Sequence, residues 1–354
     1  MPAHWFPVPP IADELLSSYI SRCARIHGMS ITVFCAVHLQ KYEVWTRDID
    51  RSASPALLKA VAELASLPLE RVEEMTLRHW ESVLNPASKH VGGPGVASWI
   101  TAVGIYHRIR RRYGLQYCRM CLRESPAFLR TWRLGAVTVC PRHHLLLDDA
   151  CPHCGVVIVP HRQNPSERHC HACGGDLTQP EQTPPEQVDI QRAEQRQERF
   201  LRALQGKAVT WGGRRVTGVD YVRGVQILES RLWLLKDRSV PKALRVIRVP
   251  LEFQRPPQRI LTLEHLGNLV EDWPTTFCRE AERFGMTMRA FAKVEHLPRW
   301  ICSGLKQIPQ GTTYDRTKRS RQVRSVLSHL HRRRPDGWRA SRARVLLREG
   351  GFET

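Results

Sequence analysis

Four pairs of potential metal ligands in the middle of the chain constrain its fold more than any other feature. Two residues separate the members of each pair, and the pairs are Cys118/Cys121, Cys140/His143, Cys151/Cys154 and Cys170/Cys173. Eighteen residues lie between the first two pairs and 15 between the last two, in or close to the zinc-ribbon range. Because a two-residue spacer lets one turn direct both side chains to one ion, two such turns can complete a tetrahedral Zn²⁺ site. The spacing predicts two structural zinc ions.

Residues that favour turns follow the ligands. Pro141 and Pro152 each follow a cysteine, and Gly155 and Gly174 each follow the second cysteine of a pair. Proline and glycine adopt the backbone conformations that such tight turns need. Few long apolar segments occur from residue 117 to residue 175. We therefore expect bound metal to supply much of the folding free energy of this region.

Two other kinds of site use similar spacings. A thioredoxin-like redox pair needs a strand that leads into a helix, and a catalytic zinc ion needs an open coordination position. Four consecutive pairs, with four ligands for each ion, favour structural sites instead. Nearby histidines are possible substitutes for a ligand, namely His144, His153, His169 and His171. The remaining cysteines have no partner at ligand spacing and are predicted to be small core residues: Cys23, Cys35, Cys278 and Cys302.

The charge of the chain indicates a polyanionic partner. Its 54 Lys and Arg residues against 34 Asp and Glu leave a formal charge of +20, which favours nucleic acid or an anionic membrane surface. No apolar run approaches the roughly 18 residues of a membrane helix, and residues 1–10 lack the features of a secretory signal. We therefore expect a cytoplasmic protein with no membrane segment and with reduced cysteines.

Motifs of catalysis are not recognisable in the sequence. The glycines at 92–95 lack the Lys-Ser or Lys-Thr that completes a nucleotide-binding loop, and no Gly-x-Ser-x-Gly occurs. The adjacent carboxylates Asp148 and Asp149 are predicted to lie in a solvated turn. The chain is therefore not expected to be an enzyme.

Helical periodicity flanks the ligand pairs. Apolar residues recur at three- and four-residue steps from Ile11 to Ile26, and Gly28 and Ser30 then lead into a second helix that contains Val37. This arrangement is typical of a DNA-binding helix-turn-helix, but two packed core helices show the same periodicity. Further helices are predicted within 55–84, 191–204, 261–277 and 284–297, with short strands at 209–219 and 244–253.

The expected fold is mainly α with small zinc-ribbon β elements. We predict an N-terminal helix-turn-helix-like domain (1–114), two tandem zinc ribbons (115–178), a Pro-rich linker (179–190), a C-terminal helical domain (191–310) and an Arg-rich C-terminal segment (311–354).

Two strongly basic segments are candidates for contact with nucleic acid, although a solvated face is the alternative. Arginine binds phosphate in a bidentate way, which favours such contacts. The candidate residues are Arg110, Arg111 and Arg112 before the first ligand pair, and Arg316, Lys318, Arg319, Arg321, Arg324, Arg332, Arg333 and Arg334 near the C-terminus.

These motifs resemble the TniQ/TnsD family of transposon target-selection proteins. The resemblance begins with Asp13-Glu14-Leu15-Leu16-Ser17-Ser18-Tyr19, Arg22 and Gly28, and continues through Trp132, Leu147 and the four ligand pairs. It covers roughly residues 5 to 178. Tyr19 and Arg119 stand where many relatives have Trp and Pro, but neither difference removes a ligand.

The resemblance implies a non-catalytic adaptor that selects where a DNA transposon inserts. Relatives bind a target DNA site or, in CRISPR-associated transposons, an RNA-guided Cascade complex, often as a homodimer. They then recruit an AAA+ ATPase that engages the transposase. The implied location is the bacterial cytoplasm, with association with the nucleoid during targeting. A stand-alone zinc-dependent transcription regulator is the alternative.

Overall fold

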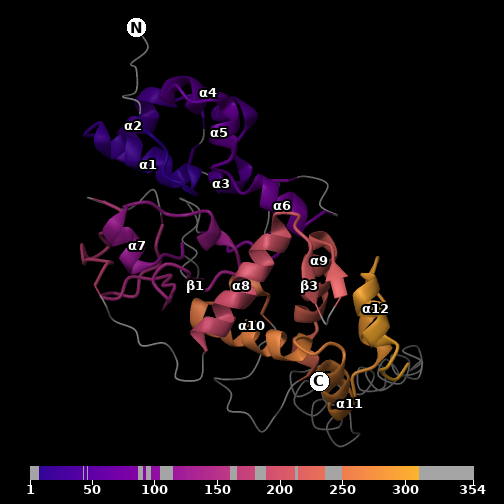
Figure 1. Ribbon diagram of the computed structural model, residues 1–354. Helices are drawn as coiled ribbons and strands as arrows, with labels where there is room; N and C mark the ends of the chain where they lie inside the picture. Colours follow the sequence, from indigo (N-terminus) through magenta and orange to yellow (C-terminus); the bar gives the residue numbers. More distant parts are fainter. Residues whose placement is uncertain are drawn as a thin grey trace, which may run out of the picture. The chain divides into compact units, whose positions relative to one another are not determined.

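The described residues of the N-terminal part form six short helices in the computed structural model (Figure 1). The structure describes residues 8–42, 44–45, 47–86, 91–92, 97–103, 115–159, 166–179, 189–211, 214–235 and 249–310. The N-terminal helices are α1 (Leu16–Ile26), α2 (Ile31–His38), α3 (Ile49–Ser52), α4 (Pro55–Ala65), α5 (Leu69–Glu73) and α6 (Arg78–Leu84). The apolar faces of α1, α2 and α4 meet in one core, in which Tyr19, Phe34 and Leu58 are fully buried.

The first helix begins five residues later than its periodicity predicts. Asp13 has a positive φ of 61°, and a turn joins the Glu14 N–H to the Ile11 carbonyl at 3.1 Å. The Asp13 carboxylate instead accepts a hydrogen bond of 2.6 Å from the Thr131 hydroxyl. The predicted turn between α1 and α2 is present: Gly28 has a φ of +67°, and the Ser30 hydroxyl accepts a hydrogen bond from the first turn of α2.

The ligand-rich region contains little regular structure. Its elements are α7 (Arg119–Glu124), the 3₁₀ helix η1 (Thr131–Arg133), and the antiparallel strands β1 (Val139–Cys140) and β2 (Leu145–Leu146). Isolated bridges continue the pairing at Tyr117 with Asp148, Ala150 with Val157, and His169 with Asp176. Short hairpins of this kind are typical of zinc ribbons.

The remaining described chain is again mainly helical. Its elements are α8 (Ile190–Leu204), β3 (Val209–Trp211), β4 (Arg214–Val216), α9 (Gly218–Glu229), η3 (Leu232–Leu234), η5 (Leu251–Phe253), α10 (Pro256–Val270), α11 (Thr275–Arg283), η6 (Met288–Phe291) and α12 (Arg299–Leu305). Strands β3 and β4 pair as an antiparallel hairpin and confirm the prediction at 209–219. Helix α8 begins one residue before the predicted 191, whereas the helix predicted at 261–277 is two helices, α10 and α11, separated by the turn at residues 271–274.

Two sequence predictions in this part are wrong. The described end of the strand predicted at 244–253 is a 3₁₀ helix, in which the Phe253 N–H donates to the Pro250 carbonyl at 2.9 Å. The helix predicted at 284–297 is reduced to η6, because Gly285 has a φ of +67° and ends α11. Apolar periodicity could not distinguish a helix from a series of buried turns here.

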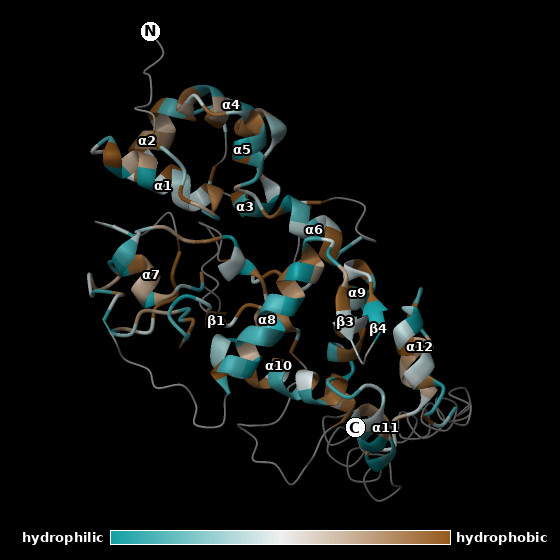
Figure 2. Ribbon diagram, in the orientation of Figure 1, coloured by the Kyte–Doolittle hydropathy of each residue, from teal (hydrophilic) through white to brown (hydrophobic). Residues whose placement is uncertain are grey.

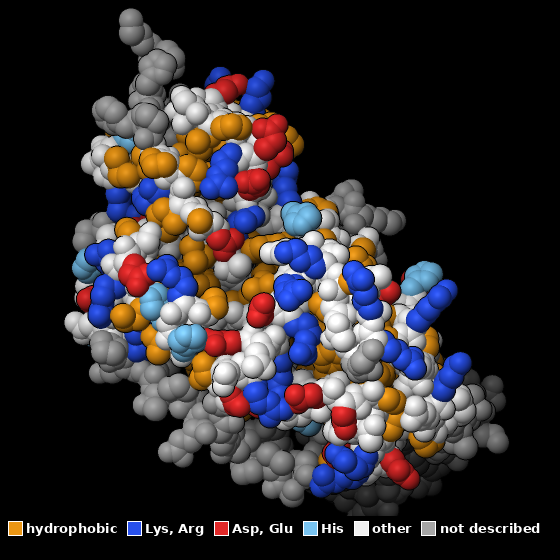
Figure 3. All heavy atoms as spheres, viewed as in Figure 1, with side chains coloured by type: hydrophobic (Ala, Val, Ile, Leu, Met, Phe, Trp, Pro, Cys, Tyr) orange, Lys and Arg blue, Asp and Glu red, His pale blue; other side chains and the backbone are white. Residues whose placement is uncertain are grey.

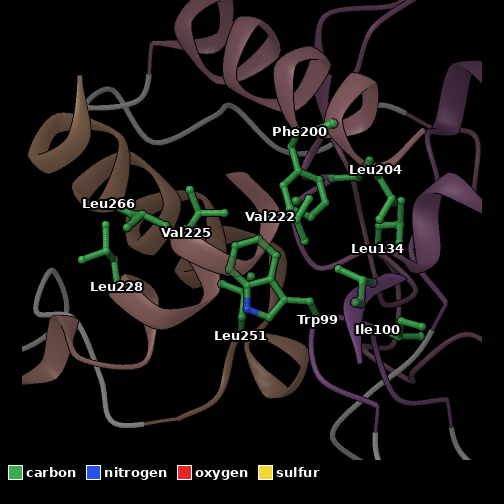
Figure 4. Close-up of a cluster of buried hydrophobic side chains, with 14 of the residues drawn as sticks. Trp99, Ile100, Leu134, Phe200, Leu204, Val222, Val225, Leu228, Leu251 and Leu266 are labelled. Carbon is green, nitrogen blue, oxygen red and sulfur yellow. The ribbon is translucent and has the colours of Figure 1, made fainter. Parts of the chain in front are cut away.

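Helices α8, α9 and α10 share one hydrophobic core with the ligand-rich region (Figure 4). Trp99 stacks obliquely on Phe200 of α8, with ring centroids 5.1 Å apart, and Val222 and Leu251 lie beside them. Gln197 of α8 also donates to the Val139 carbonyl and accepts from the Val139 N–H. Apolar residues of α9 and α10 belong to this core, and both helices contain hydrophobic (brown) segments in Figure 2. The predicted domain boundaries stay predictions.

A buried ion network joins the N-terminal helices to the ligand-rich region. The Arg133 side chain has no solvent exposure, and its guanidinium contacts Asp48 at 2.5 Å and Asp50 at 3.1 Å. Asp50 also accepts from the Ser17 N–H and hydroxyl of α1, both at 2.8 Å. The buried charges pair with each other, and these ion pairs and hydrogen bonds connect the two hydrophobic cores.

Candidate metal centres

The first and second ligand pairs meet in one cluster. The ligand atoms of Cys118, Cys121, Cys140 and His143 all lie within 4.8 Å of one another. The His143 Nδ1 atom is 3.5 Å from the Sγ of Cys118, 3.3 Å from that of Cys121 and 3.5 Å from that of Cys140. With Zn–S bonds of about 2.3 Å, the edges of a ligand tetrahedron measure about 3.8 Å or slightly less. The observed spacings therefore fit a tetrahedral ion.

The two pairs of this first cluster come from different local structures. Cys118 precedes α7 and Cys121 lies in its first turn, while Cys140 ends β1 and His143 lies in the β1–β2 turn. The three sulfurs are deeply buried, since Cys118, Cys121 and Cys140 are at most 7% exposed. They belong to the same core as Leu122 and Leu147.

Glu124 orients the histidine of the first cluster, a role that the sequence analysis did not identify. Its Oε1 atom is 2.8 Å from the His143 Nε2 atom, and its Oε2 atom is 2.6 Å from the Arg142 guanidinium. The hydrogen bond from His143 lowers the pKa of the Glu124 carboxyl below its ordinary value. An ionised Glu124 accepts from Nε2–H, which leaves the Nδ1 lone pair directed at the three sulfurs. No spacing rule marked this residue in the sequence, because Glu124 and His143 are 19 residues apart.

The third and fourth pairs form a second cluster. Cys151, Cys154, Cys170 and Cys173 bring their sulfurs within 4.8 Å of one another. Cys151 and Cys173 are 3.7 Å apart, and Cys154 and Cys170 are 3.6 Å apart. These distances also fit the edges of a sulfur tetrahedron around Zn²⁺. Cys154 and Cys173 are exposed, so this cluster is more open to solvent than the first.

Both turns of the second cluster have the same backbone geometry. The Gly155 N–H donates to the Cys151 carbonyl and the Gly174 N–H to the Cys170 carbonyl, each at 2.9 Å. Both glycines have positive φ values, +70° and +71°, which L-residues with a Cβ rarely adopt. His144 takes the equivalent position after His143 with a φ of 55°. The predicted turn role of Gly155 and Gly174 is therefore confirmed.

The thiols of the second cluster differ in their readiness to ionise. Burial raises the pKa of Cys151 to about 12, whereas the backbone N–H of Gly175 lowers the pKa of Cys173 to about 7. Four thiolates at this distance repel one another, so a cation that neutralises them would stabilise the cluster. Four soft sulfur donors at tetrahedral spacing favour Zn²⁺ among common ions.

Three of the substitute histidines have other partners. His144 Nδ1 lies 2.8 Å from Glu194, His153 Nε2 lies 3.0 Å from the Asp176 carbonyl, and His169 Nδ1 lies 2.9 Å from the Ser166 hydroxyl. Neither cluster of potential ligands in the described chain includes His171.

Asp148 and Asp149 do not lie in a solvated turn, so that prediction is wrong. Asp149 is 7% exposed and contacts the Arg255 guanidinium at 2.6 Å. Asp148 contacts Arg119 at 3.1 Å, and its backbone exchanges hydrogen bonds with Tyr117. Sequence proximity gave no sign of these partners, because Arg255 is more than 100 residues away. Of the unpaired cysteines, Cys23 and Cys35 are buried as predicted, whereas Cys278 and Cys302 are half-buried.

The predicted nucleic-acid contacts lie outside the described residues. They are Arg110, Arg111, Arg112, Arg316, Lys318, Arg319, Arg321, Arg324, Arg332, Arg333 and Arg334. The same holds for residues 180–188 of the predicted linker and for 311–354.

The exposed face of α2 does not resemble a DNA-reading surface. This second helix of the predicted helix-turn-helix exposes Thr32, Val33, Ala36 and Val37, and it contains no Lys or Arg. Val33 and Val37 are 51% and 49% exposed. A helix in the major groove usually contacts base edges and phosphates with charged, amide or hydroxyl side chains, and of these the exposed face of α2 offers only the Thr32 hydroxyl.

Comparison with known proteins supports the resemblance in the N-terminal part of the chain. The TniQ family model matches residues 5–147, which hold the N-terminal helices and the first metal cluster, and end before the second cluster. No curated protein matches the chain. No helix within the described ranges is long and apolar enough to cross a membrane.

Proposed function

We propose that the chain is an adaptor of the TniQ family of transposon target-site selection, which directs a transposase to its insertion site, because the TniQ family model matches residues 5–147. In this proposal the chain binds target DNA or an RNA-guided Cascade complex and recruits the AAA+ ATPase that regulates the transposase. The family match is the observation that carries the proposal. The net charge of +20 supports a nucleic acid as one partner.

The two clusters hold one structural Zn²⁺ each in this proposal. Cys118, Cys121, Cys140 and His143 bind the first ion, and Cys151, Cys154, Cys170 and Cys173 bind the second. Four protein ligands fill each tetrahedron, so neither ion has an open position for a substrate or a reactive water. The ions thus fix the fold of residues 115–178, and the chain acts by binding rather than by catalysis.

A rigid connection between the metal region and the helices supports an adaptor role. Arg133 links the first cluster's neighbourhood to Asp48 and Asp50, and Gln197 of α8 links it to Val139. A protein that holds two partners at a fixed separation needs a rigid connection between its two binding regions. A flexible connection would lower the effective concentration of one partner near the other. We further propose that the chain acts in the bacterial cytoplasm, at the nucleoid, and as a homodimer.

Reconstituted transposition tests the proposal. The transposase and the AAA+ ATPase of the cognate transposon are incubated with donor and target DNA, with and without the purified chain, and insertion positions are sequenced. We expect the chain to concentrate insertions at particular positions and to retain the ATPase in affinity capture. An identical insertion profile in its absence, together with no capture of the ATPase on any DNA, would show that the chain is not such an adaptor. Promoter binding without either effect would favour the transcription regulator.

A further inference from the structure

Exposed cations gather where α8 ends and the β3–β4 hairpin follows. The basic hairpin surface consists of Arg202 in the last turn of α8, Lys207 in the following loop, and Arg214 and Arg215 on β4, and all four residues are exposed. In Figure 3, Lys and Arg side chains lie along the face that α8 and this hairpin present. None of the four belongs to the basic segments that the sequence analysis singled out.

Within the described residues, the cations of this surface lack ion-pair partners. No ion pair within the described part of the chain includes Arg202, Lys207, Arg214 or Arg215. The other half of α8 differs, because Arg192 pairs with Glu271 at 2.5 Å and Arg196 with Glu264 at 3.7 Å. The positive charge is therefore neutralised at the start of α8 and left unneutralised at its end, where the helix dipole also favours cations.

The hairpin is held rigidly by its inner face. Val209 and Trp211 point inward, and Val216 is buried opposite Val209 in the register. The Trp211 ring lies 5.2 Å from the Tyr221 ring and 6.1 Å from the Trp300 ring, and the Arg199 guanidinium covers it at 5.1 Å. This packing fixes the position of the outward side chains.

The outer face offers polar donors but no aromatic platform. Arg215 pairs in register with Thr210, which is also exposed, so both side chains project from the outer face, whereas Arg214 pairs with Trp211 and is exposed on the other face of the hairpin. The aromatic residue of the hairpin, Trp211, is only 7% exposed. Single-stranded nucleic acids bind by stacking bases on exposed aromatic rings. A surface of cations and a hydroxyl without such rings fits the phosphate backbone of a duplex instead.

We propose that the basic hairpin surface contacts the phosphate backbone of duplex DNA. The proposal rests on the proposed function, since it names the surface through which the chain meets target DNA. A two-stranded ribbon fits the major groove of B-DNA, and Arg binds phosphate in a bidentate way. The contacts proposed are to phosphate oxygens, which position the duplex and carry no sequence information directly. It complements α2, which lacks cations.

The test measures the salt dependence of binding. The full chain and its R214A/R215A variant bind a short duplex of random sequence over a range of KCl concentrations, and Kd comes from fluorescence anisotropy. Each lost phosphate contact lowers the slope of log Kd against log salt by about 0.9, so we expect the slope of the variant to fall by about 0.9 for Arg215 of the outer face and by about 1.8 when Arg214 also reaches a phosphate. R214K/R215K should retain most of the slope, because lysine keeps the charge.

A matched control separates local contact from loss of net charge. Lys59 of α4 and Arg71 of α5 are exposed cations in surface ion pairs with Glu63 and Glu74. K59A/R71A removes the same charge as R214A/R215A and should leave the slope unchanged. Zinc content and melting temperature show that each variant is folded.

Two results would overturn the proposal: a wild-type slope in R214A/R215A, or an equal loss in K59A/R71A. Tighter, hairpin-dependent binding to single-stranded RNA than to duplex DNA would equally refute it. The insertion assay with R214A/R215A distinguishes failure of the hairpin assignment from failure of the proposed adaptor function. If the wild-type chain directs insertion and the variant directs it equally well, the adaptor function stands and the hairpin assignment fails. If the wild-type chain neither directs insertion nor captures the ATPase, the proposed function itself fails.

Discussion

The hydrogen bond between Glu124 and His143 provides a sharp test of the first metal centre. The side chain of His143 contacts the three sulfurs through Nδ1 and Glu124 through Nε2, at 2.8 Å. A carboxylate on the distal nitrogen fixes the tautomer and raises the basicity of a ligating histidine. Replacing Glu124 by Ala removes this partner without removing a ligand. We expect the affinity of the first centre for Zn²⁺ to fall tenfold to about a hundredfold, the usual range for such partners.

The neighbouring histidine supplies a matched control. His144 Nδ1 lies 2.8 Å from Glu194, the same distance as between His143 and Glu124, but His144 is not in a cluster of ligands. The E194A variant thus loses an equivalent histidine–carboxylate contact beside the same centre. Arg142 also contacts Glu124, and the R142A variant removes this contact while it leaves the His143 bond in place.

The assay is competition for metal between the protein and a chromophoric chelator. The wild-type chain should release two zinc ions per molecule in two phases, and E124A should shift only one phase. In E194A and R142A both phases should match the wild type. The second centre, which consists of four cysteines, serves as an internal reference within each titration. Equal affinities in E124A and the wild type, or an equal loss in E194A, would refute the assignment of Glu124 as the partner of a metal-bound histidine.

Three further predictions concern metal release, the buried ion network and the basic tail. Chelators should remove the ion of the second centre first, because Cys154 and Cys173 are exposed, and the order of release can be followed with single-centre cysteine variants; simultaneous loss would contradict it. The R133M variant should lose about 3–5 kcal/mol of stability in urea at pH 7.5, because it leaves buried carboxylates unpaired. Burial and, next in size, the Asp48 carboxylate raise the pKa of Asp50 in the folded protein to about 6, so ionisation of Asp50 costs stability as the pH rises through 6. The loss of stability in R133M should therefore be smaller at pH 5 than at pH 7.5. An equal loss at both pH values would refute this. Alanine at residues 332–334 should lower the salt slope of DNA binding similarly for all sequences, by up to about 0.9 per arginine, and an unchanged slope would assign these residues to another role.

The metal centres show how far local sequence can predict tertiary structure. The two-residue spacers fixed which side chains share a turn, and the longer spacers placed turns within reach of each other. The structure brings all eight residues together in the two expected sets. Ligand geometry is mostly local, because each pair is built within four consecutive residues, and this made the sets predictable. Glu124 was missed because orienting a ligand leaves no strict spacing rule in the sequence.

The errors have a different physical origin. Asp148 and Asp149 were expected in solvent, but Arg119 and Arg255 make their burial favourable, and a pairing over 106 residues is invisible to periodicity. The same holds for Arg133 with Asp48 and Asp50. A charged residue can be buried when a partner compensates its lost hydration, and only the folded chain shows where that partner lies.

By itself, the sequence determined the mainly helical class, the two ligand sets, the TniQ resemblance and the excess of positive charge. The helical class, the ligand sets and the resemblance depend on the order of residues over short distances. The excess of positive charge depends on the composition of the whole chain. The tertiary structure decided where unneutralised charge is presented. It paired the cations at the start of α8 with α10 and left those of the basic hairpin surface exposed. The physical reason is that an ion pair or an exposed cation is defined by neighbours in space, and packing of α8 against α10 and of Trp211 against Trp300 brings those neighbours together.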